Sequence, residues 1–203
     1  MFPRPIQKFI DAFSALPSIG PRQATRLAFH ILKLGKASIQ ELTDAVASLG
    51  TIQTCSRCFV PYEANLAASE ITLCWICSNK ERNQSIIAIV EKPTDLIALE
   101  KTKKYKGRYL VLGELDRDGI LDTEQKLRIA NVKRTIEKEF GMAEEILIAL
   151  NPTTLGDIDS ALIMQELKPI AKKITRLGRG LPTGGEIEFA DDETLSGALD
   201  GRR

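Results

Sequence analysis

The chain has 203 residues, which is enough for one domain or two small ones. Hydrophobic residues make up 43% and charged residues 27%, a balance that excludes a disordered or fibrous chain. The net charge is only +1. No apolar run approaches the roughly 20 residues that span a bilayer, and residues 1–5 do not resemble a signal peptide. We therefore expect a cytoplasmic protein without membrane attachment.

The first expected element is an amphipathic helix from about Pro5 to Ala15. Its apolar residues recur at the spacing of one helix face, and they are Ile6, Phe9, Ile10 and Phe13. A turn follows, in which Gly20 can adopt a positive φ and Pro21 suits the first position of a new helix. That second helix is expected to end near Gly35. Two helices joined by a short turn form a helix-hairpin-helix.

The second helix carries a candidate DNA-binding site. Arg22 and Arg26 are four residues apart and share a face beside the helix N-terminus, where unpaired N–H groups can bind a phosphate. Residues 1–36 contain six Lys or Arg and one acid, a local net charge of +5. These features favour sequence-independent contact with the DNA backbone. The alternative is a helical hairpin that serves only packing.

A third helix is expected from Ser38 to about Leu49. Ser38 and Glu41 have the spacing of a capping box, in which each side chain bonds to the backbone N–H of the other residue. We expect Leu42, Val46 and Leu49 to pack inward.

All cysteines of the chain lie in two Cys-x-x-Cys pairs that a fifteen-residue spacer separates. This doubled motif is typical of a four-thiolate zinc site, because each pair can form a tight turn that aims two sulfurs at one ion. The predicted ligands are Cys55, Cys58, Cys74 and Cys77. Four protein ligands leave no open position, so the metal is expected to hold structure. The alternatives are disulfides, which suit secreted chains, and a redox pair, which needs only one such motif.

From Ser85 onwards, short apolar runs alternate with helical segments. The expected strands are residues 86–90, 109–112, 146–150 and 173–177. The expected helices begin at Thr94, run from Asp122 to Phe140, and run from Asp157 to about Leu167. This alternation predicts a parallel sheet with right-handed crossovers, so the fold class is α/β.

Acidic residues collect where the expected strands end, which is where parallel sheets bind ligands. This acidic rim consists of Glu91, Asp116, Asp118, Asp157 and Asp159. Carboxylates are ligands that Mg²⁺ accepts, and such a site could support phosphoryl transfer or strand cleavage. The alternative is that solvated loops carry acids without a ligand. Because no histidine or distinctive nucleophile accompanies the rim, we interpret it as a non-catalytic acidic site.

Two further stretches give weaker signals. Lys101–Arg108 is a charged run with one aromatic residue, which we interpret as a solvated helix end because cations are stabilised there. In the tail, Glu186–Phe189 alternates like an edge strand, and Asp192 is expected to cap a final helix through Leu199.

Several motifs, in this order, resemble those of the RecR family of bacterial recombination mediators. They are LPSIGP at 16–21 and RLAFH at 26–30 (its helix-hairpin-helix), the four cysteines (its zinc finger), IVEKPTD at 89–95, GRYLVLG at 107–113 and ALNPT at 149–153 (its Toprim domain), and RGLPTGGE at 179–186 (its C-terminal signature). The resemblance covers nearly the whole chain. It implies a helix-hairpin-helix domain at 1–53, a zinc finger at 54–78, a Toprim domain at 79–177 and an oligomerisation tail at 178–203.

The resemblance also implies a function. RecR proteins have no known catalytic activity, form ring-shaped tetramers around double-stranded or gapped DNA, and act with RecO and RecF to load RecA at single-strand gaps. By the same resemblance, Glu91, Asp118 and Asp157 are expected to form the Toprim acidic site, which holds Mg²⁺ or contacts a partner.

This chain departs from the family pattern at the rim. Leu155 stands where the family has an acid, and Asn151 and Thr153 stand where catalytic Toprim enzymes carry Asp-x-Asp. These changes remove the strongest metal ligands and favour a protein that is not an enzyme. The alternative is a Mg²⁺-dependent Toprim nuclease or primase-like enzyme. The zinc spacer is also longer than expected for the family, and the Ser-Pro-Leu that usually precedes Asp118 is missing.

A homo-oligomer is expected from the chain ends. The first helices carry more apolar side chains than one hairpin can bury, and such patches mark interfaces. These side chains are Phe2, Ile6, Phe9, Ile10, Phe13 and Leu16. The strand expected at Glu186–Phe189 could pair with another chain. Two distinct self-contacts generate a closed ring of four chains.

Overall fold

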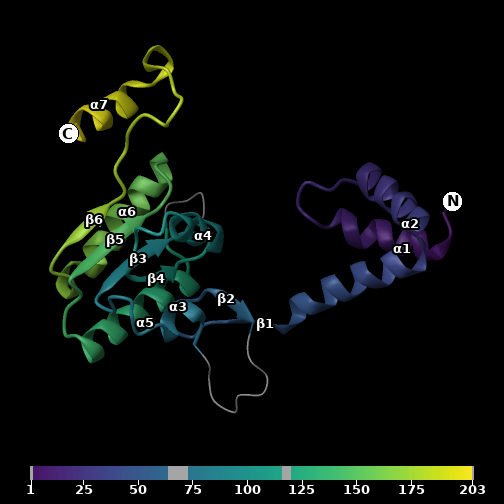
Figure 1. The fold of residues 1–203 in the computed structure, drawn as a ribbon, viewed down its shortest axis with the longest axis horizontal. Helices are drawn as coiled ribbons and strands as arrows, with labels where there is room; N and C mark the ends of the chain where they lie inside the picture. Colours follow the sequence, from purple (N-terminus) through teal and green to yellow (C-terminus); the bar gives the residue numbers. More distant parts are fainter. Residues whose placement is uncertain (1, 64–72, 116–119, 203) are drawn as a thin grey trace. The chain divides into compact units, whose positions relative to one another are not determined.

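The computed structural model describes residues 2–63, 73–115 and 120–202, and the chain divides into two compact units, residues 1–52 and 53–203 (Figure 1). The first unit is helical, and the second contains a parallel sheet with helices. None of the described helices combines the length and the apolar character that crossing a membrane requires.

The first unit contains α1 (Arg4–Ser14), α2 (Pro21–Ser48) and a short 3-10 helix, η1 (Leu49–Thr51). α1 packs against α2, and the side chains buried in this unit are Ile10, Ala24 and Ala28. Gly35, with φ 85° and ψ 172°, interrupts the helical backbone of α2, so the second expected helix ends where the sequence indicated. Helical backbone resumes at the next residue, so Ser38 lies inside the helix and does not begin it.

The turn between α1 and α2 differs from the sequence-based expectation. Gly20 has φ −87° and ψ 168°, which is extended, so the positive φ expected there is wrong. Ser18 takes the left-handed conformation instead, with φ 63°. That region costs an ordinary L-residue about 1–2 kcal/mol. Gly20 caps α2, and its N–H donates to Gln23 Oε1 at 3.2 Å.

The second half of α2 exposes the side chains that were expected to pack inward. Leu42, Val46 and Leu49 are 44%, 64% and 68% exposed. The reason is the length of α1, whose eleven residues span about 16 Å. It lies against the part of α2 that contains Ala24 and Ala28, so in this unit no described helix covers the rest.

The second unit is built around a four-stranded parallel sheet with the order β4-β3-β5-β6 (Figure 1). Its strands are β3 (Ile86–Val90), β4 (Arg108–Val111), β5 (Glu145–Ala149) and β6 (Ile174–Arg176). Its helices are α4 (Pro93–Lys101), α5 (Thr123–Glu139), α6 (Thr154–Leu167) and the 3-10 helix η2 (Lys168–Ile170). The expected α/β class with a parallel sheet is confirmed, and each strand begins and ends within two residues of its expected range.

The sheet is buried on both faces because alternate strand residues enter two separate cores. One face carries Ile87, Ile89 and Leu110 and packs on α5 and α6. The opposite face carries Ala88, Val90 and other small or aromatic residues, and packs on α4 and on the cysteine-containing segment. Continuous apolar strands are what a parallel sheet covered on both sides requires.

Helix starts in this unit follow ordinary capping chemistry. Asp122 Oδ1 accepts a hydrogen bond from the Gln125 N–H at 2.7 Å, and the Asp122 N–H donates to Gln125 Oε1 at 2.9 Å. The Thr153 hydroxyl accepts from the Gly156 N–H at 3.1 Å and so begins α6 three residues before the expected Asp157.

The tail forms a 3-10 helix, η3 (Ile187–Phe189), followed by α7 (Asp192–Asp200). The edge strand expected at Glu186–Phe189 is therefore wrong, because these residues turn and Phe189 N–H donates to Glu186 O. The final helix is present, with Asp191 rather than Asp192 as its cap. The fold still ends, as expected, in a strand, β6, and a helix.

Candidate metal centre and nucleic-acid interface

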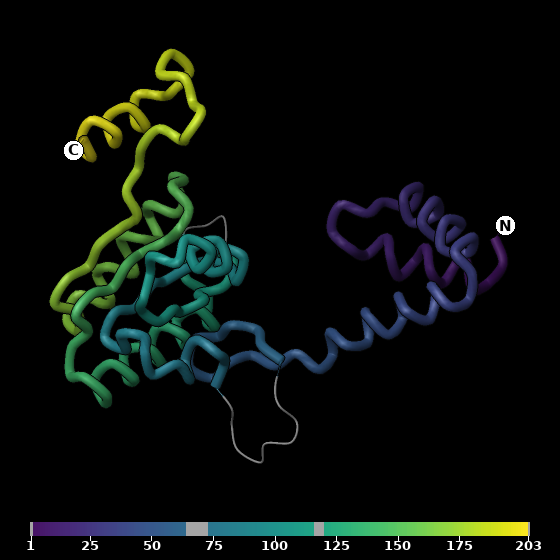
Figure 2. The backbone as a smooth tube through the Cα atoms, in the orientation of Figure 1, coloured from purple at the N-terminus to yellow at the C-terminus, as the bar shows by residue number. Residues whose placement is uncertain are grey.

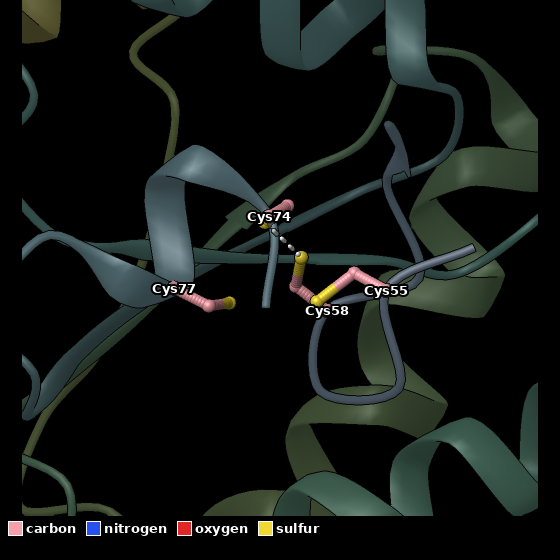
Figure 3. Close-up of side chains that lie close together, drawn as sticks. All are labelled: Cys55, Cys58, Cys74 and Cys77. Carbon is pink, nitrogen blue, oxygen red and sulfur yellow. Dashed lines mark hydrogen bonds between the residues drawn. The ribbon is translucent and has the colours of Figure 1, made fainter. Parts of the chain in front are cut away.

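The four cysteines come together in the second unit (Figure 3). They belong to two segments, one from β1 (Ile52–Thr54) to β2 (Pro61–Glu63) and one around α3 (Trp75–Ser78), which we call the finger. All four are buried, and their sulfurs lie within 4.8 Å of one another. Thiolates around zinc at about 2.3 Å stand about 3.8 Å apart. The cluster has the size and donor set of a four-thiolate metal site.

Backbone hydrogen bonds shape each half of the cluster. In the first half, the Phe59 N–H donates to Cys55 O and the Cys55 N–H donates to Val60 O, both at 2.9 Å. This tight turn requires φ 61° at Phe59, an uncommon value for a bulky residue. In the second half, the Ser78 N–H donates to Cys74 O at 3.0 Å across the single turn of α3.

Close packing couples the protonation of the thiols. The hydrogen bond from Cys58 lowers the pKa of Cys55, and the same contact raises the pKa of Cys58. Cys58 Sγ also lies 3.3 Å from Cys74 Sγ. Thiolate is the form that binds a metal, so binding a cation here displaces the protons that the thiols otherwise share.

The finger is attached to the sheet and to α5, and α3 lies beside β4 in the chain trace (Figure 2). Among the described residues of the finger, four polar or ring contacts attach it, and each joins a finger residue to β4 or α5. They are Val111 N–H to Cys58 O at 2.9 Å, Asn131 Nδ2 to Ser56 O at 3.0 Å, Arg57 Nη2 to Glu139 Oε1 at 2.7 Å, and the Arg128 guanidinium 4.9 Å from the Phe59 ring centroid. The finger and the sheet therefore share one core.

The described part of the acidic rim does not form a group of free carboxylates. Glu91 follows β3 and accepts a hydrogen bond from Asn151 Nδ2 at 2.9 Å, and Lys92 Nζ lies 3.5 Å from it. Asp159 is 1% exposed, and its Oδ2 has no hydrogen-bond partner among the described residues. Burial, together with the charge of Glu91, raises the pKa of Asp159.

Asp157 is neutralised by basic residues that the sequence did not single out. Arg179 and Arg176 both pair with Asp157 Oδ1, and Arg179 also pairs with Glu193 in α7. Hydrogen bonds from Arg179, and then from Arg176, lower the pKa of Asp157. These contacts link α6, β6 and α7, which no local sequence pattern could reveal. Asp116 and Asp118 lie outside the described residues.

The candidate DNA-binding residues lie on the first turns of α2. Arg22 and Arg26 are both exposed. They follow the turn at Ser18–Gly20, so the geometry that the sequence predicted for a helix-hairpin-helix is present on this surface. Contact with DNA itself stays a prediction.

Comparison with known proteins places these features in one family. The family model described as "RecR, helix-hairpin-helix" matches residues 6–49, the model "Toprim domain" matches 85–178, and "RecR, C-terminal" matches 180–203. A recombination protein RecR from Gloeobacter violaceus is 37% identical over 100% of this chain and 99% of its own length. The chain belongs to the RecR family.

Other RecR proteins agree in extent and similarity. One from Clostridium perfringens is 39% identical, covering 99% of this chain and 97% of its own length, and one from Dehalococcoides mccartyi is 39% identical, covering 98% and 93%. The recognition made from sequence motifs is therefore confirmed. Membership of the RecR family supports a role in recombination and DNA repair.

Proposed function

We propose that this chain is a DNA-binding recombination mediator rather than an enzyme. It would assemble into a ring of four chains in the cytoplasm, hold double-stranded or gapped DNA, and act with RecO and RecF to load RecA at single-strand gaps. The observation that carries the proposal is the similarity to RecR proteins over the entire chain. The arrangement of four domains at 1–53, 54–78, 79–177 and 178–203 belongs to the same proposal.

In this proposal zinc is held by Cys55, Cys58, Cys74 and Cys77. When bound, it supplies four strong bonds that fix the finger, and it takes part in no reaction. The buried sulfur cluster supports this assignment because its dimensions fit a tetrahedral thiolate site. Metal analysis of freshly purified, reduced protein should find one zinc per chain, and its absence would rule the assignment out.

Arg22 and Arg26 are proposed to contact the DNA backbone. Their exposure beside the α2 N-terminus and the basic character of residues 1–36 support this role. Each phosphate contact should contribute about −0.9 to the slope of log affinity against log salt on duplex DNA. The double variant Arg22→Ala, Arg26→Ala should flatten the slope, with Arg134→Ala, Arg202→Ala as the control of equal charge. An unchanged slope would mean that the hairpin does not touch DNA.

The rim supports a partner-binding or weak Mg²⁺ role for Glu91, Asp118 and Asp157 rather than catalysis. Among the described members, Glu91 is bonded to Asn151, and Asp157 is paired with Arg176 and Arg179. The competing hypothesis is a Mg²⁺-dependent Toprim nuclease or primase-like enzyme. Incubation of labelled DNA with Mg²⁺ or Mn²⁺ separates the two hypotheses. If product still forms after extensive purification of the protein, and no product forms with the Glu91→Ala variant, the protein is an enzyme.

Ring formation is supported by apolar side chains that stay exposed in the single chain. In the first unit these include Phe2 and Leu16, at 42% and 48%, together with the uncovered face of α2. In the tail, Ile187 and Phe189 are 68% and 80% exposed. Sedimentation of full-length protein should give the mass of four chains, and a chain lacking residues 1–36 should form a smaller assembly. Unchanged mass after truncation would refute the N-terminal interface.

A further inference from the structure

Trp75 is the single tryptophan of the chain, and it lies on the outside of the finger. It occupies a position between the two metal-binding cysteines of the second pair, yet its side chain is 55% exposed. The Arg82 guanidinium lies over its ring, 5.4 Å from the centroid. Because Arg82 occupies one face of the indole and more than half of the side chain is still exposed, the opposite face is open to a ligand.

The structure brings the basic run 101–108 to Arg82, the residue that lies over this tryptophan. Arg82 Nη1 donates to Gly107 O at 2.8 Å and Arg82 Nη2 pairs with Glu100, while the Asn83 N–H donates to Lys106 O at 2.9 Å. Two loops, 79–84 and 101–107, therefore lie side by side next to the finger. Sequence spacing alone did not show this, because Trp75 and Lys101 are 26 positions apart.

The two loops carry five exposed lysines. They are Lys80, Lys101, Lys103, Lys104 and Lys106. Of the ion pairs formed between described residues, none involves any of these five side chains. Of the nearby acids, Glu100 is paired with Arg82 and accepts from the Tyr109 hydroxyl at 2.7 Å. Glu81 in loop 79–84 and Glu144, which accepts from Asn83 Nδ2 at 3.1 Å, are exposed. We call Trp75, Arg82 and these lysines the Trp75 surface.

The lysine loop is held in a defined conformation. Lys103 has φ 57°, and its N–H donates to Glu100 O at 3.0 Å, which ends α4 in a tight turn. Gly107 packs so closely that a Cβ there would lie 2.5 Å from Ile86 O. A surface that is ordered before binding loses less entropy when a ligand arrives.

We propose that the Trp75 surface binds single-stranded DNA, with a base stacked on the open face of Trp75 and the lysines contacting flanking phosphates. An aromatic platform beside unpaired basic side chains is the combination that single-strand binding uses, because every base has a face that can stack while the charges follow the backbone. A base placed there would form a three-layer stack with the indole and the Arg82 guanidinium. Duplex DNA cannot use the platform, since its bases are already stacked on each other. The inference is separate from the duplex contact proposed for Arg22 and Arg26.

The single tryptophan makes the site directly observable. Reduced, zinc-loaded full-length protein is titrated with an oligothymidylate of about 16 nucleotides, a length typical of single-strand sites. Stacking should quench the tryptophan emission in a saturable way. Each phosphate contact should contribute about −0.7 to the slope of log affinity against log salt on single strands. The same titration of Arg22→Ala, Arg26→Ala should give the same quenching, which keeps this test independent of the duplex proposal.

Variants assign the binding to its residues, with a labelled oligothymidylate followed by anisotropy. Trp75→Ala should weaken binding at least about fivefold, and Trp75→Phe, which keeps a ring, should weaken it less. Lys103→Glu with Lys104→Glu should lower the salt slope, whereas Lys126→Glu with Lys168→Glu makes the same charge change on α5 and η2 and should not. Unchanged zinc content and circular dichroism show that each variant is folded.

Two results would overturn the proposal. One is oligothymidylate binding that leaves the emission of Trp75 unchanged. The other is equal weakening by Lys103→Glu, Lys104→Glu and by the α5 and η2 control pair, which would show attraction by total charge rather than a site. Loss of duplex binding in Arg22→Ala, Arg26→Ala bears only on the duplex proposal.

Discussion

The attachment of the finger to the sheet allows a quantitative prediction for Cys58→Ser. The substitution removes one of four thiolates and should release the metal, because a site with three thiolates lacks the closed tetrahedron. The finger then loses its ordered turn, since binding energy at such sites is folding energy. The sheet and α5 lose the four contacts that attach the finger.

The magnitude follows from those contacts. The bonds to Cys58 O and Ser56 O contribute about 1 kcal/mol each. The Arg128–Phe59 contact contributes about 0.5–1 kcal/mol, and the partly exposed Arg57–Glu139 pair about 0.5 kcal/mol. The total is about 3 kcal/mol, which in a chain of this size lowers the Tm by about 6–12 °C.

The assay is thermal unfolding of reduced protein, with zinc measured on the same samples. Ser56→Ala is the matched control, because it keeps the four thiols and the Ser56 carbonyl and should change the Tm by less than about 1 °C. Cys58→Ser protein that retains one zinc per chain, or loses the metal with no fall in Tm, would refute the structural role of the site.

Three other perturbations test individual features. Ser18→Gly should stabilise the first unit by about 0.5–1 kcal/mol, because relief of the left-handed strain exceeds the added chain entropy; equal or lower stability in urea would contradict this. Asp159→Asn should raise the Tm at pH 7 by about 2–4 °C. The pKa of Asp159 is raised in the folded protein, so its ionised form destabilises the fold at any pH above the ordinary carboxyl pKa. A lower Tm would show that the charge has a stabilising partner. The pKa of Asp157 is lowered, so its pairing with Arg179 should be fully formed above the ordinary carboxyl pKa and be lost as pH falls below about 4. Hydrogen exchange in α7 should rise in that acidic range. Exchange that is independent of pH after correction for the chemical rate would disprove the link.

Much of the fold was predictable because its signals are local. The continuous apolar runs at 86–90 and 146–150 correspond to buried strands, which need no partner residue to be recognised. The doubled Cys-x-x-Cys motif likewise contains its whole ligand set within one short stretch. The long helix expected from Asp122 to Phe140 is present as α5, and Asp122 caps it through a residue only three positions away.

The errors occurred where distant residues decide the outcome. Glu186–Phe189 alternates like a strand, but no other strand lies beside it in the described structure, and the segment turns. Leu42 and Val46 have helical apolar spacing, yet whether a face is buried depends on the reach of α1. Asp157 looked like a free metal ligand because the pairing with Arg179 joins residues 22 positions apart. The Trp75 surface was missed for the same reason.

The hydrogen bond from Val111 to Cys58 has a consequence for solubility. β4 is an outer strand of the sheet, and its N–H groups that face away from β3 could template another chain. The finger occupies that side, with Cys58 O accepting from the Val111 N–H. β4 also contains Tyr109, Leu110 and Val111, three buried residues, of which Tyr109 and Val111 favour strands. A chain that loses its finger through oxidation or chelation is therefore expected to present an open sheet edge and to aggregate, so the cysteine cluster protects the protein from self-association as well as from unfolding.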